Sequence, residues 1–347
     1  MPSNTAHQAY LNTRVSIMAT RLLAPDQFAS IAELELAELA ERFGLGAAVD
    51  AQPDRRRRSR AVEQALIRTL LGELTVLTRP MRTAERALVS AWGRKYALFN
   101  LKALIRGKLY DLDQEDIQAH LYELPAQQGL AEEALLRAEN VLELLRALEG
   151  GPYALIARQA REVYEQRREP SDLEATLDQR YYAGLAHQVA HFYDGNLRPL
   201  QVLVGALLDR VGLMWLLRAR FAFALSPSES YFRLVPSLRL LHRERLLGLV
   251  NLESTERVLE ALPEPLAGLL AGTADPQEIQ RRLAQYFVVE ARQVLARSHS
   301  AVARALAYLM LREIDLMTLF ALIQRRLLDL AIAPADLALT ADGRGTP

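Results

Sequence analysis

The chain has 347 residues, and its 42 basic side chains are balanced by 42 acidic ones. Balanced charge provides no whole-protein field that would attract nucleic acid or anionic lipid. The absence of cysteine excludes disulfides, thiolate metal sites and thiol nucleophiles. The first residues, Met1–Gln8, form a short polar segment, so we expect no secretory signal there.

Helix-forming residues dominate the whole chain, and apolar residues recur at spacings of three and four at Val62, Leu66, Leu70, Leu74 and Leu77. We find no extended alternation of Val, Ile and Thr and no Asn-Gly hairpin, so we predict an all-α fold. Before this stripe, Gly44–Arg60 predicts a loop containing the basic run Arg55–Arg58. A solvated loop is the default interpretation of that run, and an acidic partner or lipid headgroups are the alternatives.

One segment recurs three times, at Tyr96–Leu112, His191–Leu208 and Ile314–Leu330. Asn100-Leu101-Lys102 in the first copy matches Asn196-Leu197-Arg198 in the second. Helix-breaking residues lie between the copies, near Leu124–Gly129 and Leu225–Ser237. We therefore predict three helical units over residues 1–124, 125–236 and 237–347, with a loose tail from about residue 335. Repetition of one large unit favours a scaffold over an enzyme.

The core of the first repeated segment is apolar apart from Asn100 and Lys102. Asn100 either caps a helix or bonds a neighbouring helix, or it belongs to a polar rim around a central opening. The chain has only three lysines, Lys95, Lys102 and Lys108, and all lie in or beside this segment. A bias toward arginine explains this distribution, unless the helix requires compact ammonium groups. Our candidate partner-binding residues are Asn100, Lys102, Arg106, Lys108, Asn196 and Arg198.

Motifs for catalysis or cofactor binding are missing. Neither GxxxxGK[ST] nor GxGxxG occurs, so we expect no bound nucleotide, no cofactor and no small-molecule substrate. His187 and His191 are four residues apart and could share a metal, but we favour a partly buried pair packed against Tyr182 and Tyr193. The acids Asp111, Asp113, Glu115 and Asp116 suit the start of a helix from Asp116 rather than a catalytic pair.

The most apolar stretches are too short to cross a bilayer. Pro199–Leu208 and Val211–Leu217 are separated by Asp209 and Arg210. Since a span needs about 20 mostly apolar residues, we predict buried helices and no transmembrane segment.

Five motifs occur in the order typical of one family: Tyr10-Leu11-Asn12-x-Arg14-Val15, Asn100-Leu101-Lys102-x-Leu104-x-Arg106-Gly107-Lys108, Gly151-Pro152-Tyr153, Leu177-Asp178-x-x-Tyr181-Tyr182 and Asn196-Leu197-Arg198. Together they resemble the C subunit of bacterial and archaeal V/A-type ATPases, which is homologous to the d subunit of the vacuolar enzyme. The resemblance runs from about Tyr10 to Leu330. The chain departs from the family in its loops, at Ser226–Ser237 and Ala331–Ala338.

The resemblance implies three similar helical bundles arranged around a pseudo-threefold axis as a funnel with a central cavity. It implies a non-catalytic, peripheral protein on the cytoplasmic face of the cell membrane. Its partners would be the central shaft subunits (D and F type) and the membrane proteolipid ring, and it would carry torque for transport of protons or sodium ions or for ATP synthesis.

Two other interpretations remain. The first is a helical-repeat adaptor that binds peptide or RNA on a concave face, but units of roughly 100 residues are too long for such repeats. The second is an all-α metalloenzyme that uses His187 and His191. Neither nucleic acid nor a small molecule is expected as a partner in the interpretation that we favour.

Overall fold

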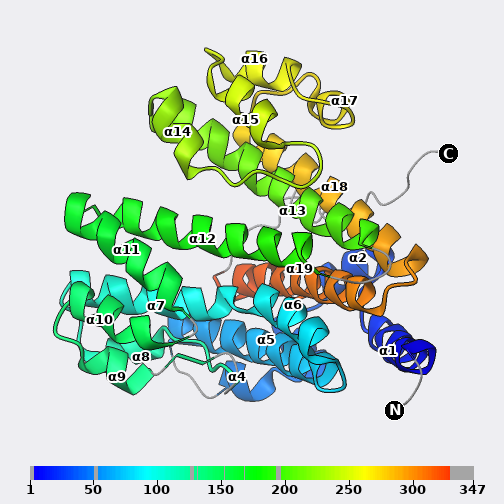
Figure 1. The fold of residues 1–347 in the computed structure, drawn as a ribbon. Coiled ribbons are helices and arrows are strands. Elements are labelled where there is room, and N and C mark those ends of the chain that lie inside the picture. The colour runs from blue at the N-terminus through cyan, green and yellow to red at the C-terminus, as the bar shows by residue number, and fades with distance from the viewer. Residues whose placement is uncertain are drawn as a thin grey trace. The chain divides into compact units, whose positions relative to one another are not determined.

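The computed structural model describes residues 4–50, 54–125, 129–130, 132–151, 153–167, 169–192 and 197–328. This described part is built from helices and contains no β-strand, which confirms the all-α prediction (Figure 1). The chain divides into two compact units. One combines residues 1–89 with residues 276–347, and the other comprises Ser90–Asp275.

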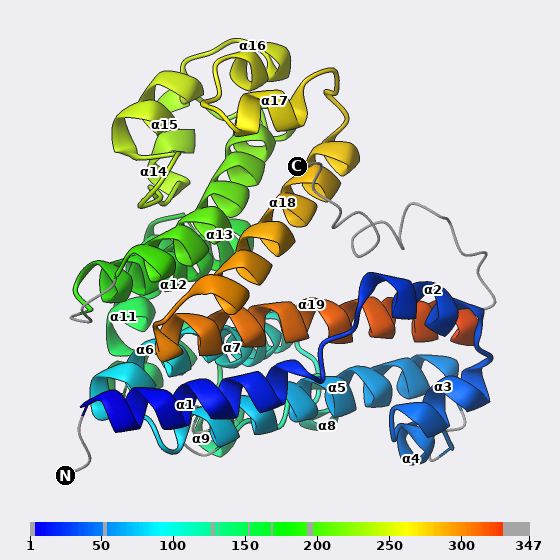
Figure 2. The ribbon, with the colours of Figure 1, turned by 90° about the vertical axis from the view of Figure 1, so that its right-hand side faces the viewer.

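The helices of the first unit are α1 (Asn4–Ala19), α2 (Pro25–Glu33), α3 (Leu36–Arg42), α4 (Gly46–Asp50), α5 (Arg55–Thr78), α18 (Pro276–Arg297) and α19 (Ala301–Leu327), with α6 (Thr83–Gly93) running across the division. Helices α1, α5 and α18 pack against α19, which is buried along most of its length (Figure 2). The predicted stripe from Val62 to Leu77 is buried on α5, as expected from its spacing.

Polar side chains fix how α1 and α5 lie on α19. Arg304 of α19 donates to Asn12 Oδ1 at 2.7 Å and to Ser16 Oγ at 2.9 Å, both on α1. Tyr308, one turn further along, donates its hydroxyl to the buried Glu73 of α5 at 2.5 Å. Asn12 belongs to the first motif of the family resemblance, so this motif has a structural role inside the unit.

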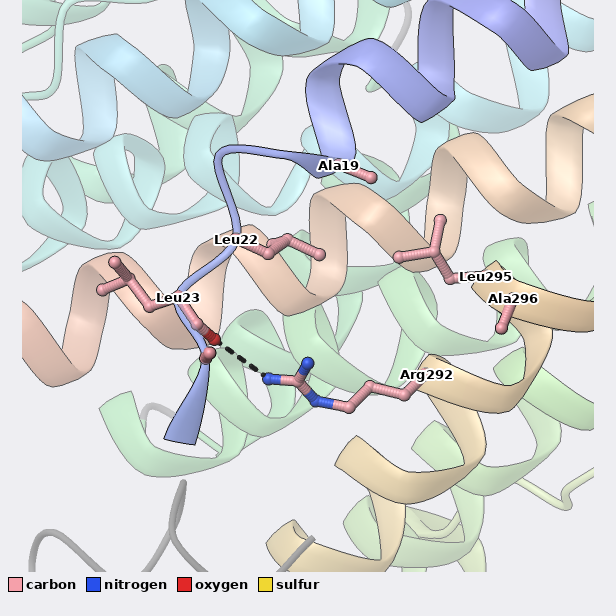
Figure 3. Close-up of a pocket in the computed structure, with 7 residues that line it drawn as sticks. Ala19, Leu22, Leu23, Arg292, Leu295 and Ala296 are labelled. Atoms are coloured by element: carbon pink, nitrogen blue, oxygen red, sulfur yellow. Dashed lines mark hydrogen bonds between the residues drawn. The ribbon is translucent and has the colours of Figure 1, made fainter. Parts of the chain in front are cut away.

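The connection between α1 and α2 is held at Leu23 from two sides. Leu23 N donates to Asp315 Oδ2 of α19 at 2.8 Å, and Arg292 Nη2 of α18 donates to Leu23 O at 3.2 Å. Figure 3 shows the second bond beside a pocket of about 330 Å³, lined also by Leu22 and Leu295. Burial raises the pKa of Asp315 to about 6, although the bond from Leu23 N and the nearby Arg292 and Arg312 oppose the rise.

The second unit contains α7 (Lys95–Leu109), α8 (Gln114–Ala119), α9 (Glu132–Arg137), α10 (Val141–Ala147), a 3-10 turn (Leu148–Gly150), α11 (Ala154–Arg167), α12 (Pro170–Ala190), α13 (Arg198–Leu217), a π-helical turn (Arg218–Ala222), α14 (Pro227–Arg233), α15 (Arg243–Val250), α16 (Thr255–Glu260) and α17 (Leu266–Leu270). Its core joins buried side chains of α7, α10, α11 and α12. Within the described residues, the three copies of the repeated segment overlap α7, α13 and α19.

The three consecutive units expected from the repeat stay a prediction, as does their arrangement as a funnel. The compact units follow different boundaries because α5 and α19, from the first and last thirds of the sequence, pack together. The compact units are defined by contacts between helices that can be far apart in the sequence, whereas the repeat is defined by sequence similarity alone.

One helical stretch in the described part of the chain, Arg198–Ala222, is long and apolar enough by composition to span a bilayer. Its most apolar window is 72% buried inside the protein. Asp209, in the middle of the stretch, is also buried, and its Oδ1 accepts from Leu241 N at 2.8 Å. A core helix explains both observations, in agreement with the predicted buried helices.

One predicted loop and one predicted boundary segment contain helix. Arg55–Arg58 forms the first turn of α5, because the side chain of Asp54 accepts hydrogen bonds from the backbone N–H groups of Arg56 and Arg57. The Pro/Ser segment Leu225–Ser237 contains α14, which starts with a capping box between Ser226 and Glu229. The loop prediction for Arg55–Arg58 was wrong because the Asp54 N-cap starts a helix that the local composition does not indicate, whereas the boundary near Leu225–Ser237 stays a prediction.

Asp315 generates a prediction about pH. The pKa of the Asp315 carboxyl is higher in the folded protein than in the unfolded chain, so the folded protein binds the carboxyl proton more tightly. The stability that this proton contributes is therefore fully present below about pH 4 and is lost as pH rises through 6. Asp315→Asn keeps an oxygen for Leu23 N and cannot ionise. As pH rises from 4 to 7, the native chain should therefore lose about 2 to 3 kcal/mol of unfolding free energy that the variant does not lose.

Urea unfolding at several pH values measures this difference. The exposed Asp26→Asn in α2 controls for the loss of one carboxylate at the surface. A difference between Asp315→Asn and the native chain that stays constant across the range would contradict the prediction.

Candidate interaction site

The predicted site residues of the first repeated segment lie along α7, where they face other helices of the second unit. Lys102 and Arg106 are one turn apart on α7, and Asp178 and Glu174 are one turn apart on α12. Lys102 Nζ donates to Asp178 Oδ1 at 2.5 Å, and Arg106 donates to both carboxylate oxygens of Glu174 at 2.6 Å. These two ion pairs, which we call the charge ladder, join α7 to α12.

The basic side chains of the two ion pairs in the charge ladder differ in exposure. The side chain of Lys102 is only 13% exposed, whereas that of Arg106 is 58% exposed. The bidentate bond to Glu174 raises the pKa of Arg106, so the guanidinium stays charged. Lys102 therefore serves mainly inside the unit, and Arg106 retains a face toward solvent.

Asn100 lies inside the unit rather than at its surface. It is 1% exposed; its Nδ2 donates to Tyr122 O at 2.8 Å and to Glu132 Oε1 at 2.9 Å, and its Oδ1 accepts from Tyr122 N at 2.7 Å. Of the two roles considered for Asn100, the structure supports an internal bond, made to the segment after α8 and to α9. The amide thus bonds both backbone polar groups of Tyr122.

Lys108 and Gly107 position the short helices around α7. Lys108 Nζ donates to Leu136 O, at the end of α9, at 2.6 Å. A Cβ on Gly107 would come within 2.4 Å of Ile117 Cγ1, so glycine allows α8 to approach α7 closely. Helix α8 begins at Gln114, two residues earlier than predicted, because the side chain of Asp113 caps it by accepting from Asp116 N.

The last two candidates lie at the start of the second copy. Asn196 falls outside the described residues. Arg198 is exposed in the first turn of α13. Arg198 and Arg106 are thus the predicted site residues whose side chains have substantial exposure in the structure.

Roles for Glu174 and Asp178 did not follow from the sequence, although Asp178 stands in one of the family motifs. The available signal was their spacing of four, which matches the spacing of Lys102 and Arg106. Tyr181, in the same motif as Asp178, donates its hydroxyl to Trp92 O at 2.8 Å and so ties α12 to the segment that precedes α7. The motifs on α7 and α12 are therefore complementary sides of one helix contact.

The histidine pair has a different environment from the one predicted. His187 and His191 are exposed, with ring centroids 4.0 Å apart, so the expectation of a partly buried pair is wrong. Tyr193 is outside the described residues. No group of three or more side chains suited to hold a metal ion occurs among the residues that the structure describes.

Comparison with known proteins identifies the class to which this helical architecture belongs. The family model for the ATP synthase (C/AC39) subunit matches residues 11–331. The chain therefore belongs to the ATP synthase C/AC39 subunit family, which confirms the resemblance derived from the motifs.

Individual relatives support this assignment. The chain is 28% identical to the C subunit of the A-type ATP synthase of Methanosphaera stadtmanae, over 61% of this chain and 54% of the relative. It is 27% identical to the C subunit of the A-type ATP synthase of Methanothermobacter thermautotrophicus, over 80% of this chain and 69% of the relative. The first match thus spans about half the length of that relative.

Asn100 provides a test of this internal architecture. Asn100→Ala removes two buried hydrogen bonds to the backbone of Tyr122 and a part-buried one to Glu132, so it should lower the unfolding free energy by about 1 to 3 kcal/mol. Asn251→Ala is the matched control, because Asn251 is exposed and bonds only a carbonyl one turn away. Urea unfolding of both variants gives the comparison, and equal losses would contradict a core role for Asn100.

Proposed function

We propose that this chain is a non-catalytic component of a rotary V/A-type ATP synthase, where it links the central shaft to the membrane proteolipid ring and transmits torque. The observation that carries the proposal is the family match over residues 11–331. The same match favours this role over the helical-repeat adaptor. The chain would act as a peripheral protein on the cytoplasmic face of the membrane.

The packing of the helices supports a mechanical role. A part that transmits torque must not yield, and close-packed interiors have low compressibility. Long helices bury most of their apolar residues in both units, and polar contacts such as the charge ladder and the Tyr308–Glu73 bond fix their register. These features oppose sliding of one helix along another.

Among the predicted partner-binding residues, Arg106 and Arg198 are the ones we retain for contact with another protein. Asn100, Lys102 and Lys108 hold neighbouring helices of their own unit, so we assign them to positioning. Arg106 and Arg198 offer exposed guanidinium groups on α7 and α13, helices that carry two copies of the repeat. Arginine suits contact with carboxylates of a partner protein.

Assembly is the first test of the proposed function. The tagged chain should co-purify from detergent-solubilised membranes with the nucleotide-binding subunits and the proteolipid. A chain that stays alone in such a preparation would count against membership of the complex.

A second experiment separates internal from external roles of the charge ladder. The exchange Arg106→Glu with Glu174→Arg retains an ion pair between α7 and α12 but reverses the charge offered at position 106. We expect this exchange and Arg198→Glu to weaken assembly at least roughly tenfold, because each places a carboxylate where a partner carboxylate is expected.

Co-purification yield and ion pumping per ATP hydrolysed measure the effect. Arg137→Glu on α9, at a side chain that is 78% exposed, controls for an unrelated reversal of charge. If both test variants assemble normally and pump the native number of ions per ATP hydrolysed, Arg106 and Arg198 do not contact the partner.

A further inference from the structure

Aromatic and basic side chains lie on α14 and α15 of the second unit, two helices that are labelled in Figure 1. The rings of Tyr231 and Phe232 are neighbours on α14, and Arg243 Nε of α15 donates to the Tyr231 hydroxyl at 3.1 Å. Leu247 follows Arg243 by one helical turn and so lies on the same face of α15. We call these four residues the aromatic–arginine patch.

The apolar members of the patch project into solvent. Phe232 is 73% exposed and Leu247 is 50% exposed. The opposite faces of their helices are buried through residues such as Ser230 and Leu246. Since large apolar groups at such exposure cost free energy in water, two of them linked through Tyr231 and Arg243 call for an explanation.

The backbone that presents Phe232 is firmly held. Gln179 of α12 donates to Phe232 O at 2.7 Å, and the neighbouring Arg233 pairs with Asp172 at the start of α12. The capping box between Ser226 and Glu229 fixes the other end of α14. The ring is therefore displayed in a preorganised position, which lowers the entropic cost of binding.

Positive charge accumulates around the patch although the whole chain is neutral. Residues 218–247 contain six arginines and two glutamates, and the pairing of Arg233 with Asp172 leaves a local net charge of +3. Arg220 donates to the carbonyls of Leu225 and Val250, and Arg245 donates to that of Leu240. These acceptors are uncharged, so they hold the guanidinium groups without cancelling their charge.

We propose that the aromatic–arginine patch binds the surface of an anionic phospholipid bilayer. Phe232 and Leu247 would enter the boundary between headgroups and acyl chains, and Arg243 and its basic neighbours would contact lipid phosphates. Interfacial binding requires this combination of protruding apolar side chains and a basic surround. A protein partner would call for a larger contiguous apolar core than two projecting side chains.

This lipid contact goes beyond the proposed link between shaft and ring, because it needs no other protein. The two can therefore fail separately. The purified full-length chain is mixed with phosphatidylcholine vesicles that contain or lack phosphatidylglycerol, and bound protein is measured by flotation. The native chain should float with the phosphatidylglycerol vesicles and should be released at high salt.

Single substitutions test which residues make the contact. Phe232→Ala should lower the partition coefficient roughly tenfold by removing buried apolar area, and Arg243→Gln should lower it about fivefold by removing one charge near the membrane. Arg243→Lys should bind nearly as well as the native chain, since it keeps the charge. Circular dichroism confirms that each variant is folded.

Leu155→Ala on α11 and Arg297→Gln at the end of α18 are matched controls; Leu155 is 73% exposed, Arg297 is also exposed, and both lie outside the patch. Equal binding to both kinds of vesicle, or native binding by Phe232→Ala and Arg243→Gln, would overturn the proposal. The native chain could fail to bind either kind of vesicle while Phe232→Ala and Arg243→Gln assemble poorly with the other subunits. That result would show that the patch binds protein instead. Vesicle binding by a chain that fails to assemble would contradict only the proposed function.

Discussion

Side-chain contact between helices is the constraint on which this structure depends. In an all-α chain the backbone hydrogen bonds are made within each helix, so they do not fix how one helix lies on another. Apolar burial brings the helices together, but it is not directional. A small number of polar links must therefore set the register, and Tyr308–Glu73 in the first unit and the charge ladder in the second perform this task.

The same requirement explains why the motif residues have internal roles. Asn12, Asn100 and Lys102 are polar residues on largely apolar helices, and each binds a group on another element. A buried polar group without a partner costs about 1 to 3 kcal/mol. Substituting one of these residues therefore removes a hydrogen bond and also deprives its former partner, on the neighbouring element, of a polar contact. These links therefore help to position the helices within each unit.

Exposed arginine side chains, and with them local positive charge, are distributed unevenly over the protein surface. Arg106 takes part in the contact between α7 and α12 and still exposes much of its side chain to solvent. The patch on α14 and α15 uses its arginines differently, since carbonyl oxygens orient its basic neighbours and leave their charge available. A neutral chain can thus offer a local basic surface without attracting polyanions over its whole exterior.

The sequence by itself determined the helical class, the buried stripe of α5 and the family, because helix propensity and apolar spacing act over three or four residues. It also named Lys102 and Arg106 as candidates for contact with a partner, which stays a prediction. Only the tertiary structure decided their partners, since Lys102 and Asp178 are 76 positions apart and Asn100 and Tyr122 are 22 apart. The start of α5 at Arg55 likewise depended on the orientation of Asp54, which composition does not specify. Local patterns determine helices, whereas contacts between distant residues decide which polar groups remain free for function.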